Sequence, residues 1–247
     1  MLNIFMTLTN AIPVAGRHVC YLPSAIENIL KQSVKPKEVI IIVSDYSSED
    51  DDNIIEKCRE LLYKNDIVPI IKTFTFAYRA GKNRSIAYDH CNTDIISFQD
   101  CDDLTHKDRN KLIITAFEQL NAAQILHGQS YNEDALDTNI NFKDCTIECV
   151  DNIWTDRSVL ISDVHHGAIS LHMGRINYDF HFPNSKQGQD VQLVESFLDK
   201  NKEFNTEHKM YVIRDTSIYV WRKEHSSHNI SDNRESKKLE LLKYLGL

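Results

Sequence analysis

The sequence of 247 residues has no apolar run close to the roughly 20 residues that a membrane-spanning helix needs. Its opening residues, 1–16, also lack the basic start of a secretory signal. These two absences lead us to expect a soluble, cytoplasmic protein without a transmembrane segment. Peripheral attachment to a membrane stays compatible with them.

Paired cysteines are missing as well. The chain has six cysteines, and no two of them form a C-x-x-C pair. Zinc ribbons use such pairs and small disulfide scaffolds are dense in cysteine, whereas these six cysteines are spread along the chain. Both classes are therefore disfavoured, and we expect reduced thiols.

The chain has no surplus of positive charge. Its formal net charge is -8 at pH 7, whereas non-specific nucleic-acid binders carry excess Lys and Arg on one face. We therefore expect no nucleic-acid partner, although a nucleotide can still bind locally.

The segment 9–17 contains one glycine and one basic residue, which disfavours the glycine-rich triphosphate loop of a nucleotidyltransferase. No G-x-G-x-x-G follows the first expected strand, which disfavours a dinucleotide-binding oxidoreductase.

Strand and helix patterns alternate through the first half of the chain. The run Val39 to Val43 is entirely β-branched, which is typical of a parallel strand buried on both faces. We expect strands at 2–8, 39–43, 68–76 and 95–98, and helices at 18–33, 54–62, 81–90 and 107–120. Such alternation predicts an α/β fold with a central, mostly parallel sheet flanked by helices.

The second half is less regular. We expect strands at 168–173, 210–213 and 217–221, a helix at 190–198, and a terminal helix from Arg234 to Tyr244. No linker or repeat separates the halves, so residues 1–247 are expected to form one domain.

Polar residues follow several expected strands. They are Thr9 and Asn10 after the first strand, Asp45 after the second and residues 100–103 after the fourth. Ligands of open α/β sheets bind beyond the carboxyl ends of the strands. The convergence of these residues predicts a binding site at that edge.

Two segments match the pattern Asp-x-Asp. Asp50 to Asp52 opens an expected helix, where carboxylates favour the positive end of the dipole and need no ligand. Asp100 and Asp102 instead follow a buried strand, where close carboxylates repel each other unless a cation lies between them. Mg²⁺ or Mn²⁺ would bind such oxygen ligands together with a diphosphate. The alternative for Asp100 to Asp103 is a solvated acidic loop.

Three segments resemble, in the same order along the chain, the motifs of family-2 glycosyltransferases with the GT-A fold. They are residues 43–50, 81–84 and 95–103, and their order and spacing match as well as their residues. The resemblance implies a nucleotide-binding half at 1–103 and an acceptor-side half at 104–247 that ends in a C-terminal helix. It also implies a Mn²⁺ or Mg²⁺ cofactor and a nucleotide-sugar donor, usually a uridine diphosphate sugar.

The resemblance assigns roles to residues of the first half. Asp45 would accept a hydrogen bond from the nucleotide base, and Thr9 would line the same pocket. Asp100 would contact ribose or metal, and Asp102 would be the principal metal ligand. Lys82 and Arg84 would bind the donor, because a cation stabilises the negative charge of the departing diphosphate.

Two later segments extend the resemblance. Residues 188–193 resemble the segment that carries the catalytic base, so Asp190 would deprotonate the acceptor hydroxyl, unless it is only a helix N-cap. Residues 221–225 resemble the late Arg and His segment, in which Arg222 would bind the diphosphate. His225 would then reach the metal, with His228 as the competing choice.

Acceptor contacts are expected from His166 and Trp154. Most of the 11 histidines are structural or exposed, and a single Trp is commonly buried in packing, so both assignments have structural alternatives.

Together these features predict a metal-dependent inverting glycosyltransferase that moves a sugar to a hydroxyl of a glycan or glycoprotein. The alternatives are a sugar nucleotidyltransferase and a catalytically inactive module that binds a sugar or nucleotide.

Overall fold

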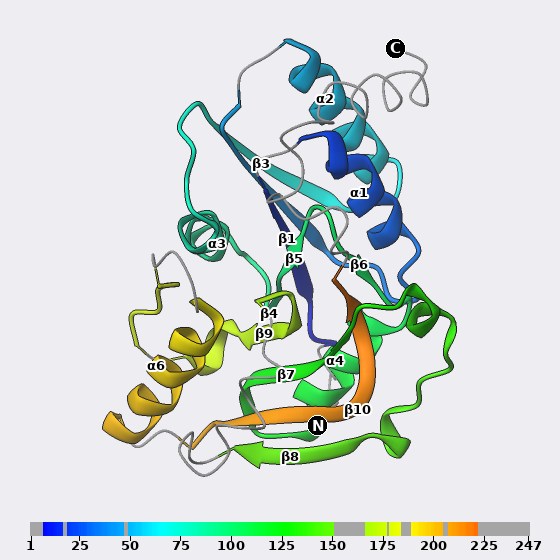
Figure 1. Ribbon diagram of the computed structural model, residues 1–247. Helices are drawn as coiled ribbons and strands as arrows, with labels where there is room; N and C mark the ends of the chain where they lie inside the picture. Colours follow the sequence, from blue (N-terminus) through cyan, green and yellow to red (C-terminus); the bar gives the residue numbers. More distant parts are fainter. Residues whose placement is uncertain are drawn as a thin grey trace, which may run out of the picture.

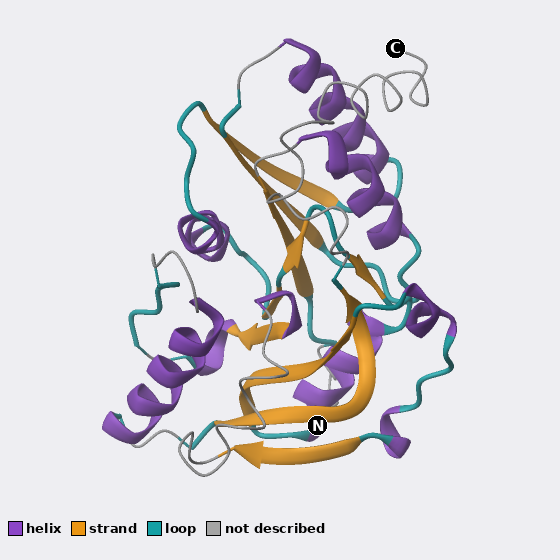
Figure 2. Ribbon diagram, in the orientation of Figure 1, coloured by secondary structure: helices purple, strands orange, loops and turns teal. Residues whose placement is uncertain are grey.

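The computed structural model is a mixed α/β fold in which one ten-stranded sheet lies between layers of helices (Figure 1, Figure 2). This architecture confirms the predicted fold class. The structure describes residues 7–16, 19–46, 49–150, 166–176, 178–183, 189–204 and 207–221.

Four parallel strands form the first half of the sheet, in the order β3-β2-β1-β4. A two-residue strand, β5, continues the line of β4 and also pairs with β1. The bounds are β1 (Asn10–Gly16), β2 (Glu38–Ser44), β3 (Val68–Phe74), β4 (Ile95–Ser97) and β5 (Gln99–Asp100), with helices α1 (Leu22–Leu30), α2 (Glu49–Tyr63) and α3 (Ala80–Asp89).

Strand β2 is buried on both faces, as its β-branched run predicts. Val39, Ile41 and Val43 pack in the cluster that α1 and α2 share with the sheet. Ile40 and Ile42 point to the opposite face, where they meet Ala87 of α3. Each such side chain contributes roughly 1.5–3 kcal/mol by leaving water, so this alternation fixes the register of β2.

The expected first strand at 2–8 lies largely outside the described residues, and residues 7–9 are not in a strand. β1 begins at Asn10 and contains Pro13, a residue that is rare inside sheets because it has no N–H to donate. The sheet tolerates Pro13 because, on the side of β1 away from β2, the neighbouring strand is interrupted between β4 and β5. There the Phe98 N–H donates to the Ile169 carbonyl at 3.3 Å instead.

The second half adds mixed pairings. β9 runs antiparallel to β4 and β7, while β10 runs parallel to β7 and antiparallel to β6 and β8. The expected strands at 210–213 and 217–221 are one strand, and β6, β7 and β8 were not predicted. The bounds are β6 (Leu104–Thr105), β7 (Ala122–Ser130), β8 (Thr146–Val150), β9 (Ile169–His172), β10 (Lys209–Val220), α4 (Arg109–Gln119) and α6 (Gln189–Glu203).

A bulge interrupts the pairing of β10 with β7. Ile213 pairs with His127 and Ser217 pairs with Gly128, so residues 214–216 have no counterpart in β7. Gly128 allows the close approach, because a Cβ atom there would lie 2.6 Å from the Thr216 carbonyl oxygen.

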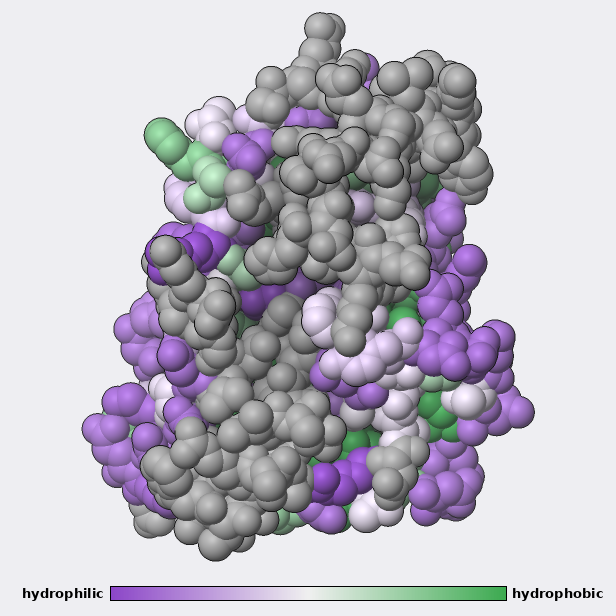
Figure 3. Space-filling model, viewed as in Figure 1, coloured by the Kyte–Doolittle hydropathy of each residue, from purple (hydrophilic) through white to green (hydrophobic). Residues whose placement is uncertain are grey.

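Helices α1, α2 and α4 pack on one face of the sheet, and α3 and α6 pack on the other (Figure 1). The six cysteines, all of them in the described part of the chain, form no disulfide. No helix of the described residues is both long and apolar enough to cross a membrane. The described side chains visible in Figure 3 are mostly hydrophilic, with small and separate apolar patches. The expected terminal helix, Arg234 to Tyr244, lies outside the described residues.

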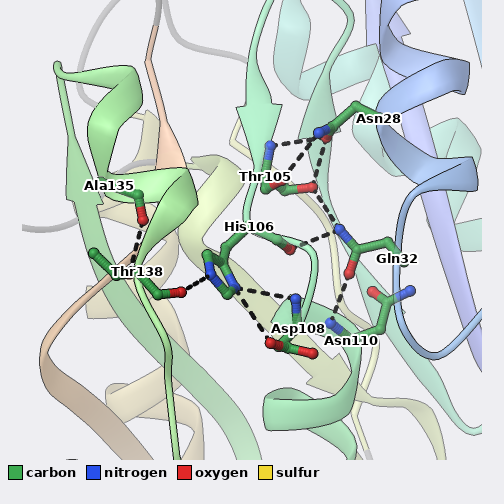
Figure 4. Close-up of polar contacts among 8 residues, drawn as sticks. All are labelled: Asn28, Gln32, Thr105, His106, Asp108, Asn110, Ala135 and Thr138. Carbon is green, nitrogen blue, oxygen red and sulfur yellow. Dashed lines mark hydrogen bonds and ion pairs between the residues drawn. The ribbon is translucent and has the colours of Figure 1, made fainter.

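Side-chain hydrogen bonds fasten β6 to α1 (Figure 4). Asn28 accepts from the N–H and the hydroxyl of Thr105, both at 2.8 Å, and donates to the Thr105 carbonyl at 3.0 Å. Gln32 donates to the Thr105 hydroxyl and to the His106 carbonyl and accepts from the Asn110 N–H. The segment after the acidic residues 100–103 is therefore held by α1.

We expect Asn28→Ala to lower the free energy of unfolding by about 2 kcal/mol, because it leaves part-buried backbone groups of Thr105 without partners. Urea unfolding measures this loss. The control is Asn65→Ala, which removes one exposed bond to the Leu61 carbonyl and should cost no more than about 0.5 kcal/mol. Equal losses in the two variants would contradict the role assigned to Asn28.

Candidate active site

The carboxyl ends of β2, β3 and β5 meet at one edge of the sheet, and predicted site residues follow two of these strands. Asp45 follows β2 in a left-handed conformation with φ of 62°, which Asp tolerates better than most residues. Its N–H donates to the Phe76 carbonyl at 3.0 Å. Asn83 at the start of α3 donates to the Ser44 hydroxyl, so α3 is tied to the same edge.

A tight cluster of carboxylates lies at the carboxyl end of β5, beginning with its last residue, Asp100. Ligand atoms of Asp100, Asp102 and Asp103 all lie within 4.8 Å of one another. Cys101 points into the core beside α1 and α2, while Asp100 and Asp102 remain partly exposed. These oxygens match the hard ligand set that Mg²⁺ and Mn²⁺ prefer.

Arg84 joins α3 to this cluster. Its guanidinium Nη2 donates to Asp100 Oδ1 at 2.8 Å, and the Arg84 side chain is only 2% exposed. A buried guanidinium beside the cluster offsets part of the mutual repulsion of the carboxylates. This ion pair ties α3 to the acidic residues 100–103.

Tyr219 of β10 supports the cluster from the buried side. Its hydroxyl donates to Asp103 Oδ2 at 2.6 Å and accepts the Asp100 N–H at 3.2 Å. Burial, followed by the charges of Asp103 and Asp100, raises the pKa of Tyr219 well above its ordinary value. The phenol therefore stays protonated at neutral pH and remains a donor.

Arg109 of α4 holds the surrounding backbone. Its Nη2 donates to the carbonyls of Phe98 and Gly167 at 3.0 and 2.6 Å, and its Nε donates to His127 Nε2 at 3.1 Å. Burial lowers the pKa of Arg109 to about 10, so the guanidinium stays charged at neutral pH. Because His127 Nε2 accepts, its Nδ1 carries the proton and donates to the Gly128 carbonyl.

The structure places Thr9 far from the acidic residues 100–103, although the sequence predicts that it lines the nucleotide pocket. Thr9 precedes β1, and its N–H and hydroxyl both donate to Asp94 Oδ2 at 2.9 Å. Ala15, six residues further along, is the β1 residue that pairs with Asp100. At about 3.3 Å per residue, Thr9 lies about 20 Å from Ala15, near the amino ends of the parallel strands rather than their carboxyl ends.

The other predicted residues differ in how far the structure describes them. Lys82 is exposed on α3, in contrast to the buried Arg84. Asp190 lies in the first turn of α6, and His166 opens a short 3-10 helix, η4 (His166–Ala168), but their side chains are not described. The remaining predicted residues lie outside the described part of the chain: Trp154, Arg222, His225 and the competing His228.

Sequence reasoning missed the buried supports of the cluster. Gln99, for example, donates to the Asp103 carbonyl at 3.3 Å. One signal was present for Arg109: it shares a helical stripe with Leu112, Ile113 and Ala116, and a cation in such an apolar stripe indicates a specific partner. Tyr219 gave no such signal.

The acidic segment and Arg84 both fall within a family match. Residues 11–161, more than half of the chain, match the model described as Glycosyl transferase family 2. The chain belongs to this glycosyltransferase family. The resemblance predicted from the motifs is thereby confirmed. Thr9, Asp190 and the later predicted residues lie outside the matched range, so the match does not bear on them.

Solved GT-A glycosyltransferases share the fold. S. aureus TarS 1-349 in complex with UDP-GlcNAc is 19% identical, with a TM-score of 0.67 over 91% of this chain and 61% of that chain. Mannosyltransferase PcManGT from Pyrobaculum calidifontis, in complex with GDP-Man and Mn²⁺, is 14% identical, with a TM-score of 0.55 over 98% of this chain and 66% of that chain. This chain thus spans less than two thirds of either structure. No curated protein matches it in sequence.

We expect Arg84→Gln to lower the free energy of unfolding by about 1–3 kcal/mol. Loss of one partner of a buried pair costs about 3–5 kcal/mol, but Asp100 is 22% exposed and can regain water. The control is Arg59→Gln, which breaks an exposed pair with Glu56 and should change stability by no more than about 0.5 kcal/mol. Thermal and urea unfolding of both variants check the difference, and similar values would refute the structural role of Arg84.

Proposed function

We propose that this protein is a metal-dependent, inverting glycosyltransferase. It moves a sugar from a nucleoside diphosphate donor, a UDP-sugar, to a hydroxyl of a glycan or glycoprotein. The observation that carries the proposal is the cluster of Asp100, Asp102 and Asp103 at the carboxyl edge of the sheet, with Arg84 against it. Family membership supports the reaction class. The UDP-GlcNAc bound to TarS and the Mn²⁺ bound to PcManGT support the donor and the metal.

Asp102 and Asp100 would hold Mn²⁺ or Mg²⁺, since their oxygens form a hard ligand set within bonding reach of one ion. When bound, the ion supplies positive charge to the diphosphate of the donor. Arg84 orients Asp100, and the exposed Lys82 is available for the diphosphate. Asp45 lies at the end of β2 on the same edge and would accept a hydrogen bond from the base.

Asp190 is the proposed base. A carboxylate in the first turn of a helix is held ionised by the helix dipole, which suits a proton acceptor at neutral pH. It would take the proton of the acceptor hydroxyl while that oxygen attacks the anomeric carbon opposite the diphosphate. The new bond to the sugar forms as the bond to the diphosphate breaks, and this single displacement inverts the configuration.

The remaining assignments complete the proposal. Arg222 would bind the diphosphate and His225 the metal, with His228 as the competing ligand. His166 would face the acceptor, and its place beside Gly167, which contacts Arg109 under the cluster, supports that assignment. Trp154 would offer a stacking surface for an acceptor sugar.

Asp102→Asn should abolish metal-dependent binding of UDP, because the substitution removes the charged oxygen that binds the ion most directly. Calorimetric titration of UDP with and without Mn²⁺ measures the effect. The matched control is Asp89→Asn, which changes an exposed carboxylate at the end of α3 and should leave binding intact. Absence of metal-dependent UDP binding by the unaltered protein would refute the proposed donor and metal.

Asp190→Asn should reduce sugar transfer by about 100-fold or more while binding of UDP and Mn²⁺ stays unchanged, because only the proton acceptor is lost. Product formation from a UDP-sugar in the presence of a glycan acceptor gives the rate. Transfer at the unaltered rate would assign the base to a different residue.

A further inference from the structure

The hydroxyl of Tyr219 contacts the acidic turn at two points. It donates to the side chain of Asp103 and accepts the backbone N–H of Asp100. One oxygen atom thereby joins the two ends of the segment that carries Asp102.

The Tyr219 ring has little freedom to move. The guanidinium carbon of Arg109 lies 5.6 Å from the centroid of the ring, within the range of a cation–π contact. Gly167 lies against the edge of the ring, and a methyl group at Gly167 would overlap the ring atoms. The side chain is 0% exposed, so the position of the hydroxyl is set by packing.

We infer that Tyr219 is a positioning residue for the donor site: its hydroxyl fixes the spacing of Asp100 and Asp103 around Asp102, and thereby the affinity for a divalent cation with a nucleoside diphosphate. This inference rests on the proposed function. Tyr219 acts through the aspartates, because a fully buried side chain does not reach the donor.

The physical reason is the repulsion among the carboxylates. Asp103 is 1% exposed and receives a short hydrogen bond from Tyr219, which stabilises its charged form in place of water. Without that bond the carboxylates would relax away from one another. Cation binding would then have to restore their spacing, which weakens affinity.

The first test compares Tyr219→Phe with Tyr178→Phe. Both changes remove one buried hydroxyl, but the Tyr178 hydroxyl makes no hydrogen bond among the described residues. Titration of UDP with Mn²⁺ should give a dissociation constant about 10-fold higher for Tyr219→Phe and one within about 2-fold of the unaltered protein for Tyr178→Phe. Thermal unfolding without metal separates this effect from a general loss of stability.

Hydrogen exchange in the metal-free protein gives a second readout. The Asp100 amide should exchange about 10-fold faster in Tyr219→Phe, because its acceptor is lost, and at the unaltered rate in Tyr178→Phe. Unchanged exchange at Asp100, or unchanged UDP and Mn²⁺ affinity, would overturn the inference while leaving the proposed function in place. No metal-dependent binding by the unaltered protein would instead overturn the proposed function.

A third comparison displaces the ring without altering Tyr219. Gly167→Ala should weaken UDP and Mn²⁺ binding by about 10-fold or more, because the new methyl group pushes the ring from its place. Gly174→Ala is the control, since the nearest atom to a methyl group there lies at 3.8 Å, an ordinary contact. Equal affinities of the two alanine variants would also overturn the inference.

Discussion

Three carboxyl groups within 4.8 Å of one another repel, and the structure around them opposes that repulsion. Each neighbouring element supplies one restraint. Helix α3 brings Arg84 to Asp100, β10 brings Tyr219 to Asp103, and α1 fastens the following strand through Asn28. The acidic turn is therefore a product of the whole sheet and its helices, rather than a property of the residues 100–103 alone.

The parallel half of the fold could be predicted because its signals are local. The run Val39 to Val43 gave β2, and the buried strand before Asp100 gave the edge at which the carboxylates gather. β1 was missed because Pro13 weakened its strand pattern and the apolar run at 2–8 offered a competing choice. Only the interruption between β4 and β5, a feature of the neighbouring strands, explains why Pro13 is tolerated.

The supports of the site could not be predicted in the same way, because they depend on which distant segments become neighbours. Tyr219 follows Asp103 by 116 residues, and their contact arises only because β10 pairs with both β7 and β6. Alternation along a strand shows which of its residues share a face, but it does not show which residues from distant segments pack against that face. Arg109 was detectable as a misplaced charge, yet its acceptors Phe98 and Gly167 were not.

The bulge at residues 214–216 has a consequence for how such a chain can change over evolution. Side chains of a strand alternate between faces, so gaining or losing one residue before Tyr219 would turn its hydroxyl to the opposite side of the sheet. Substitutions in the bulge are compatible with the site as long as its length is kept. The length of this segment, more than the chemical character of its residues, therefore sets the orientation of Tyr219, and a single-codon insertion there would do more harm than most replacements.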